Sequence, residues 1–182
     1  MSVTGAPDWI EVSVAHVRRA DDEPHPKHLM LLEESGGTRR LPIWIGPAEA
    51  TAMTLWLESA EQPRPMTYSL TASILQAAGS PIREVRITAL TRSVYYAAVI
   101  VDGPHGPREV DARPSDAVNL ALVASVPIRI DSELLGEAQT ARSADAMAYP
   151  TGTAELAAEA LRHERERMQE FDPGKDQAPG AR

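Results

Sequence analysis

The pattern of apolar and polar positions predicts three successive strands near the start of the chain. Apolar and polar residues alternate along residues 9–17, which is the period of a strand with one buried face. Residues 27–34 and 39–45 are also apolar at their centres and flank the turn sequence Ser35-Gly36-Gly37. These two segments are therefore expected to pair as a hairpin.

Two helices are expected next. Residues 47–61 begin with Pro47, which suits the first helical position, and Glu49 places an acid in the first turn. The segment Gln62-Pro-Arg-Pro65 should end this helix. Thr67 is a suitable cap for a second helix, which Gly79-Ser-Pro81 should stop near residue 78.

The second half of the chain repeats the order of strands and helix. Residues 82–90 and 108–112 are predicted strands, and residues 94–101 are apolar almost throughout, which predicts a strand covered on both faces. Residues 114–125 have few polar positions after their first turn and predict a buried helix. Residues 127–130 predict a last short strand.

Two strand-to-helix corners share a sequence pattern. Leu41-Pro-Ile-Trp-Ile-Gly-Pro-Ala-Glu-Ala50 and Arg108-Glu-Val-Asp-Ala-Arg-Pro-Ser-Asp-Ala117 both contain Pro-x-acid-Ala, 67 residues apart. Two further strands are expected before each corner. The repeat predicts an α/β (α+β) fold of duplicated β-β-β-α units, although Pro-x-acid-Ala is also simply a good helix start.

The charge distribution separates a domain from a tail. Residues 1–130 carry 12 basic and 15 acidic residues, whereas residues 131–182 carry 6 and 11. We predict a flexible N-terminus at residues 1–8, one domain at 9–131 and an acidic tail at 132–182. The tail includes a plausible helix at 153–171 and a Pro/Gly-rich end typical of disorder.

The amino-acid composition excludes several classes of protein function. The absence of cysteine excludes a disulfide scaffold, a thiolate nucleophile and a zinc site with sulfur ligands. No apolar run approaches the ~18 residues of a membrane span, and no signal-peptide pattern is present. A cytoplasmic protein is expected. The net charge of −8 argues against tight, nonspecific binding to nucleic acid.

The second corner contains the residues that are best suited to catalysis or ligand binding. Asp111, Arg113, Ser115 and Asp116 lie within six residues at a strand-to-helix junction. Free backbone N–H groups and Arg113 could hold a phosphate there, and the carboxylates could bind a hard cation or orient water. The competing interpretation is an Arg–Asp pair that locks the corner.

Other candidates are fewer. Arg64 lies between two prolines and is a candidate phosphate contact or an ordinary surface arginine. The histidines have no recognised metal spacing, and no Walker, dinucleotide-binding or nucleophile-elbow motif is present.

Three blocks together resemble the bifunctional nuclease (BFN domain) family: Leu41-Pro-Ile-Trp-Ile-Gly-Pro-Ala-Glu-Ala50, Pro63-Arg-Pro-Met-Thr67, and Val110-Asp-Ala-Arg-Pro-Ser-Asp-Ala117 followed by Val126-Pro-Ile-Arg-Ile130. The similarity covers about residues 11–131. The resemblance implies an α/β fold with duplicated halves, homo-oligomers and activity on RNA and DNA.

One position departs from that pattern. The family sequence usually continues from the second block with His-Asp, whereas this chain has Tyr68-Ser69. An imidazole and a carboxylate suited to acid–base or metal chemistry are missing. Tyr68 can still donate a hydrogen bond or stack on a base.

Two hypotheses follow. The first is a nuclease in which Arg64, Arg113 and Ser115 bind phosphate, while Glu49, Asp111 and Asp116 act in acid–base or cation roles, with a divalent cation as a candidate cofactor. The second is a non-catalytic regulatory or interaction module that binds a protein partner, for example through the acidic tail. Both include a homo-oligomer, because residues 29–32, 94–101 and 114–125 are more apolar than a small monomer needs.

Overall fold

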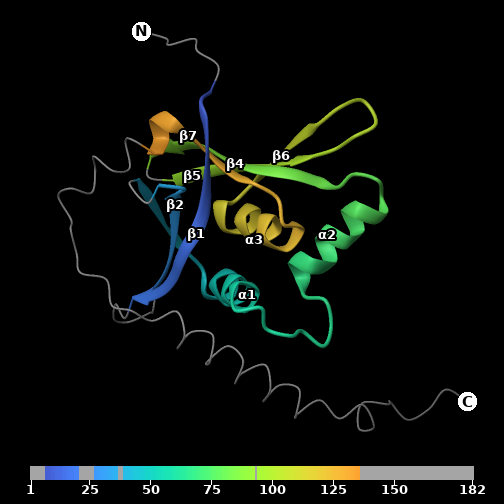
Figure 1. The fold of residues 1–182 in the computed structure, drawn as a ribbon, viewed down its shortest axis with the longest axis horizontal. Coiled ribbons are helices and arrows are strands. Elements are labelled where there is room, and N and C mark those ends of the chain that lie inside the picture. The colour runs from blue at the N-terminus through green and yellow to red at the C-terminus, as the bar shows by residue number, and fades with distance from the viewer. Residues whose placement is uncertain (1–6, 21–26, 37–38, 93, 136–182) are drawn as a thin grey trace, which may run out of the picture.

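The computed structural model describes residues 7–20, 27–36, 39–92 and 94–135. These residues form a curled seven-stranded sheet in the order β3-β2-β1-β7-β4-β5-β6, with helices in its concave face (Figure 1). The strands are β1 (Trp9–Ala20), β2 (Lys27–Glu34), β3 (Arg40–Ile45), β4 (Ile82–Thr91), β5 (Val94–Val101), β6 (Arg108–Ala112) and β7 (Ile128–Asp131); the helices are α1 (Pro47–Leu57), α2 (Thr67–Ala77) and α3 (Pro114–Ala124).

The predicted duplication is confirmed. Strands β1, β2 and β3 form an antiparallel meander followed by α1, and β4, β5 and β6 form a second meander followed by α3. Strand β7 joins the halves, antiparallel to β1 and parallel to β4. The mixed α+β architecture therefore agrees with the expected fold class.

Both duplicated helices begin at a proline, as the sequence predicts, but α1 ends earlier than expected. The expected end was near residue 61, whereas the helix stops at Leu57. Ser59 adopts a left-handed conformation with φ 52°, which a continuing right-handed helix does not allow. Helix α3 ends at Ala124, and the next residue, Ser125, is also left-handed, with φ 54°.

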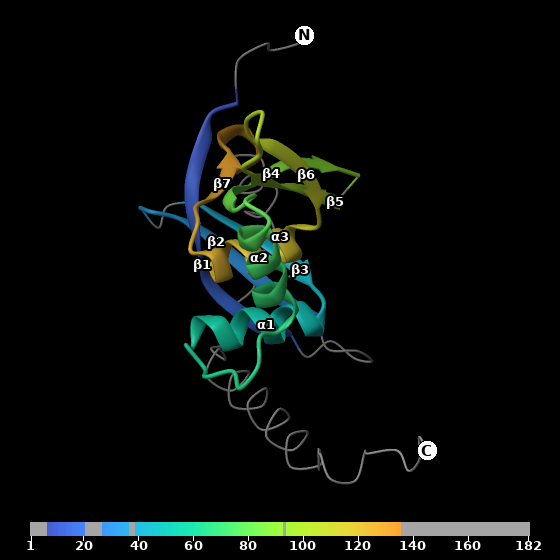
Figure 2. The same cartoon turned by 90° about the vertical axis from the view of Figure 1, so that its right-hand side faces the viewer.

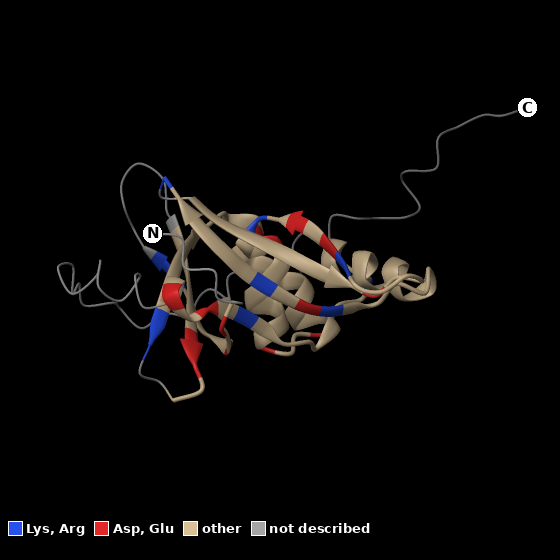
Figure 3. Cartoon of the chain, turned by 90° about the horizontal axis from the view of Figure 1, so that it is seen from above, with Lys and Arg blue, Asp and Glu red and all other residues tan. Residues whose placement is uncertain are grey.

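Helix α3 lies at the centre of the domain, between the two meanders and between α1 and α2 (Figures 1 and 2). Ala117, Val118 and Ala121 are buried in the main hydrophobic cluster. Charged residues mark the strands and the rims, while the central helices are almost free of them (Figure 3). The apolar character of α3 is thus satisfied inside the chain.

This packing corrects the reason given for expecting an oligomer, because most of the apolar segments concerned are buried inside the chain. Met30 and Leu32 are fully buried within the chain, as is most of β5 from Ala97 onward. These parts of the segments are covered within the chain and cannot pack against a second copy, whereas Val94 and Tyr96 at the start of β5 are 55% and 44% exposed. Large exposed apolar side chains also occur on α2, at Leu70 and Ile74. The homo-oligomer itself stays a prediction.

The packed core continues past Asp131. Residues 132–135 form a helical turn in which Leu134 and Leu135 are 6% and 0% exposed. The predicted tail helix and the disordered end lie outside the described residues, as do residues 1–6. Within the described part of the chain, no helix is long and apolar enough to span a membrane.

Candidate active site at two helix starts

The two strand-to-helix corners meet, and Arg113 joins them. Its Nη2 donates to Glu49 Oε1 at 2.7 Å and to Asp116 Oδ1 at 3.0 Å, and its Nε donates to Asp116 Oδ2 at 2.6 Å. Glu49 and Arg113 are 64 residues apart in the chain. A guanidinium that binds both oxygens of a carboxylate has a well-defined orientation. We call Glu49, Tyr68, Arg113 and Asp116 the Arg113 cluster.

The duplicated sequence explains how the two acids come together. Glu49 and Asp116 are each the third residue of a helix that begins with proline. The position before the proline differs, being Gly46 in one corner and Arg113 in the other. A Cβ atom on Gly46 would lie 2.2 Å from Glu49 Oε2. The glycine therefore leaves room for the Glu49 carboxylate, and the single arginine serves both acids.

Asn119 holds the two helices in this arrangement. Its side-chain nitrogen donates to the backbone oxygen of Glu49 at 3.1 Å and to that of Ser115 at 2.9 Å. Asn119 is 2% exposed, and a buried amide is stabilised only when it is hydrogen-bonded. The bond to Glu49 therefore ties the start of α1 to α3.

Tyr68 brings the first turn of α2 into the cluster. Its hydroxyl donates to Asp116 Oδ1 at 2.7 Å. Sequence reasoning recognised that Tyr68 could donate a hydrogen bond but did not include it among the site residues. The available signal was its position, where the family pattern has histidine directly after Pro63-Arg-Pro-Met-Thr67.

The protonation states follow from these contacts. Burial raises the pKa of Tyr68, and the hydrogen bond to Asp116 raises it further. Burial alone would raise the pKa of Asp116, but the hydrogen bonds from Arg113 and Tyr68 outweigh burial and lower it from its ordinary value of 3.8. The two carboxylates raise the pKa of Arg113. At neutral pH, Asp116 is ionised and the Tyr68 phenol is neutral, so Tyr68 is a donor and not a base.

We expect Asp116→Asn to lower the pKa of Tyr68. The substitution removes the negative charge beside the phenol, and with it the repulsion that disfavours the phenolate. Ultraviolet titration of the tyrosines measures this shift. The chain has four tyrosines, so Tyr68→Phe identifies the relevant component. An unchanged titration of Tyr68 in Asp116→Asn would show that the contact is absent in solution.

Arg113 is accessible as well as paired. Its side chain is 67% exposed, while those of Glu49 and Asp116 are 14% and 29% exposed. No described residue accepts a hydrogen bond from its Nη1. A pocket of about 490 Å³ lies beside it, lined by β3, the start of β5 and both corners. The geometry therefore combines the two interpretations of this corner: Arg113 joins two acids and still presents a donor to solvent.

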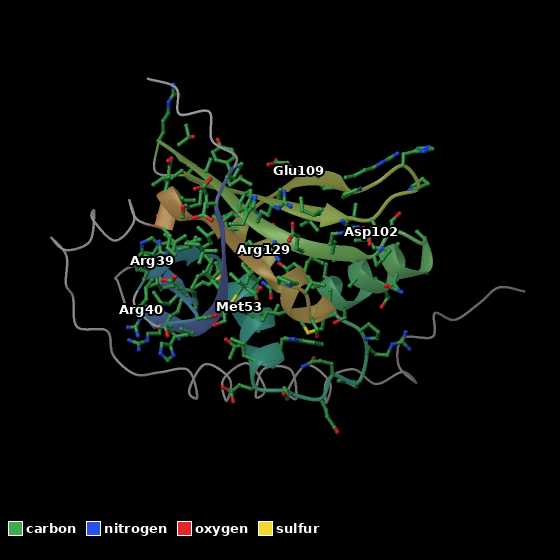
Figure 4. The ribbon with its side chains drawn as sticks, turned by 45° about the horizontal axis from the view of Figure 1, so that its top comes forward. Arg39, Arg40, Met53, Asp102, Glu109 and Arg129 are labelled. Carbon is green, nitrogen blue, oxygen red and sulfur yellow. The ribbon has the colours of Figure 1, made fainter. Side chains whose placement is uncertain are left out.

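The structure brings together some of the predicted site residues and separates others. Glu49, Arg113 and Asp116 belong to the Arg113 cluster, and Ser115 lines the adjoining pocket with 7% exposure. Asp111 is exposed and lines a different pocket together with Glu109, because residues two apart in a strand face the same side. Figure 4 shows Glu109 of β6 well away from Met53, which lies on α1, the helix that also carries Glu49. Arg64 is exposed in the loop between α1 and α2 and makes no hydrogen bond or ion pair with the cluster.

The cluster contains its own cation in the form of the guanidinium. Within residues 7–20, 27–36, 39–92 and 94–135, no group of three or more His, Asp or Glu side chains is arranged to hold a metal ion. Arg113 binds one oxygen of Glu49 and both oxygens of Asp116. Glu49 Oε2 is the carboxylate oxygen of the cluster that no described residue hydrogen-bonds. One free carboxylate oxygen beside a guanidinium is not a set of ligands for a divalent cation.

The fold and the site together define a class: an α+β domain of two β-β-β-α halves with an arginine–carboxylate cluster where the halves meet. The chain matches the family model described as the bifunctional nuclease domain over residues 30–143. The chain belongs to this family, and the resemblance seen in the sequence is confirmed.

Individual relatives agree with this assignment. The uncharacterized protein MT1877 of Mycobacterium tuberculosis (strain CDC 1551 / Oshkosh) is 40% identical over 128 residues, which are 70% of this chain and 75% of that protein. Bifunctional nuclease 1 of Oryza sativa subsp. indica is 29% identical over 122 residues, 65% of this chain and 36% of that protein. Bifunctional nuclease 1 of Arabidopsis thaliana is 26% identical over 117 residues, which are 63% of this chain and 36% of that protein.

Proposed function

We propose that this protein is a nuclease that hydrolyses phosphodiester bonds of RNA or DNA at the Arg113 cluster. The observation that carries the proposal is the position of Arg113, which joins two carboxylates, is two-thirds exposed and borders a pocket. Membership of the bifunctional nuclease domain family supports it, as do the names of the plant relatives.

The substrate phosphate would bind at the start of α3. Arg113 Nη1 offers a charged donor, and the backbone N–H of Ser115 has no partner among the described residues. The N-terminus of a helix favours an anion because its free N–H groups carry partial positive charge. Asp116 has a positioning role, because it orients the guanidinium.

Glu49 is the proposed general base. Its Oε2 atom would take a proton from a water molecule as the water oxygen attacks phosphorus. The bond from phosphorus to the leaving sugar oxygen then breaks, and that oxygen takes a proton from solvent. Asp116 is less suited to this role because its lowered pKa makes it a weaker base.

Replacement of Arg113 tests the proposal. Arg113→Ala should raise the KM for a labelled oligonucleotide about 10- to 150-fold, since a hydrogen bond to a charged group contributes about 1.5–3 kcal/mol. Arg83→Ala is the matched control, because Arg83 is also an exposed arginine in an ion pair, with Asp102, away from the cluster. Equal activity of wild type, Arg113→Ala and Arg83→Ala would show that the cluster is not the site.

A second candidate function is a non-catalytic interaction module. Tyr68 in place of the family histidine favours it, as does the engagement of Arg113 by two acids. This function predicts that highly purified wild-type protein hydrolyses neither RNA nor DNA, and that Arg113→Ala lowers the melting temperature. Detectable hydrolysis that Arg113→Ala weakens without loss of stability would exclude it.

We also propose that the protein assembles as a homo-oligomer in the cytoplasm. Leu70 and Ile74 on α2 are 52% and 58% exposed, and large exposed apolar side chains commonly mark protein interfaces. The cysteine-free composition suits a reducing compartment. A protein partner for the acidic tail is a further proposal. Light scattering at micromolar concentration that gave the monomer mass would contradict the oligomer.

A further inference from the structure

We infer that the pocket beside Arg113 binds an unpaired nucleobase, that Trp44 is its stacking surface, and that single-stranded nucleic acid is therefore the preferred substrate class. This inference rests on the proposed function and deepens it.

Trp44 is placed to contact a ligand and not to fill the core. It lies near the end of β3, two residues before Gly46, and is 54% exposed. Its neighbour Ile43 is buried in the hydrophobic cluster, so the alternation of the strand turns Trp44 toward the other face. Trp44 lines the pocket of about 490 Å³ together with its β3 neighbours Pro42, Ile43 and Ile45.

The pocket joins an aromatic wall to a charged end. Trp44 and Tyr95 line it from the two meanders, and Arg113 and Ser115 line it from the start of α3. Ser115 is more than nine-tenths buried. A volume of this size lies within the roughly 300–1,000 Å³ typical of ligand sites.

Nucleic acid presents the matching chemistry, a flat aromatic ring beside a phosphate. Base–aromatic stacking together with a cationic contact to the backbone is the common way in which proteins bind single strands. In a duplex both faces of each base are covered by neighbouring bases, so Trp44 could not reach one without unstacking it. The arrangement therefore favours a single strand over a duplex.

Binding of oligonucleotides by the full chain tests the inference. The probes are a fluorescein-labelled oligothymidylate, an abasic strand with the same number of phosphates, and a blunt duplex, measured by anisotropy with chelator present and with strand integrity checked on gels. Trp44→Ala should weaken oligothymidylate binding roughly 5- to 150-fold, the equivalent of the stacking contribution of one base. Binding of the abasic strand should change little, and Trp44→Phe should retain most of the wild-type affinity.

Two variants separate the possible outcomes. Trp56→Ala is the matched control, since Trp56 is a similarly exposed tryptophan (42%) on α1 that does not line the pocket. Arg113→Ala should weaken both the oligothymidylate and the abasic strand. If Arg113→Ala weakens binding and Trp44→Ala does not, or if the duplex binds as tightly as the single strand, this inference is wrong while the proposed function stands. If the wild-type protein binds none of the three probes, both are wrong.

Discussion

Replacement of Glu49 by glutamine is expected to reduce kcat about 10²- to 10⁴-fold, the usual contribution of a general base. Glutamine has nearly the same shape, and its amide oxygen can still accept the hydrogen bond that Arg113 donates to Glu49 Oε1. It cannot take a proton from water. The KM should change much less than kcat, because the phosphate contacts of Arg113 and α3 remain.

Glu58→Gln is the matched control for Glu49→Gln. Glu58 is exposed and directly follows the same helix, so its substitution makes the same chemical change outside the cluster. Hydrolysis of labelled RNA and DNA and thermal unfolding should be measured for both variants. If Glu49→Gln were as active as Glu58→Gln, Glu49 would have no role as a base, and a substrate-bound cation or Asp116 would have to be considered in its place.

Truncation after Asp131 is expected to destabilise the protein severely, whereas truncation after Leu135 should keep the melting temperature within a few degrees. The sequence suggests that everything after Asp131 is dispensable, but Leu134 and Leu135 are buried in the core. Loss of a buried leucine side chain costs about 2–5 kcal/mol, so loss of both approaches the roughly 5–15 kcal/mol of a whole domain.

The two truncated chains differ by four residues, so their comparison isolates the helical turn at residues 132–135. Leu135→Ala in the full chain is an independent measure, and it should lower the free energy of unfolding by about 2–5 kcal/mol. Circular dichroism melting of all four proteins checks both expectations. A large loss of stability on truncation after Leu135 would mean that residues 136–182 also stabilise the domain. Full stability after truncation at Asp131 would contradict the packing of Leu134 and Leu135.

Local pattern predicted the order of the elements because each depends on neighbours in the chain. Alternation marked the strands, and Pro47 and Pro114 marked helix starts at the residues where the structure has them. The repeat of Pro-x-acid-Ala predicted two equivalent corners. The early end of α1 was missed, since Ser59 carries no turn signal as strong as glycine and its left-handed conformation is set by the surrounding packing.

The candidate site was predictable only in part. Sequence spacing placed Arg113 and Asp116 within one helical turn, and their ion pair is local. The same spacing suggested Asp111, but successive side chains of a strand point to opposite faces, and the tertiary structure decides which face meets α3. Asp111 consequently lies on the exposed outer side.

The sequence by itself determined two matched strand-to-helix corners, each with an acid in its first helical turn. Only the tertiary structure decided that Arg113 reaches Glu49 across 64 residues and that Tyr68 reaches Asp116 across 48. These contacts depend on how the sheet curls and on which helix faces pack together. That packing depends on the burial of apolar side chains over the whole domain, so it cannot be predicted from any short segment of the sequence.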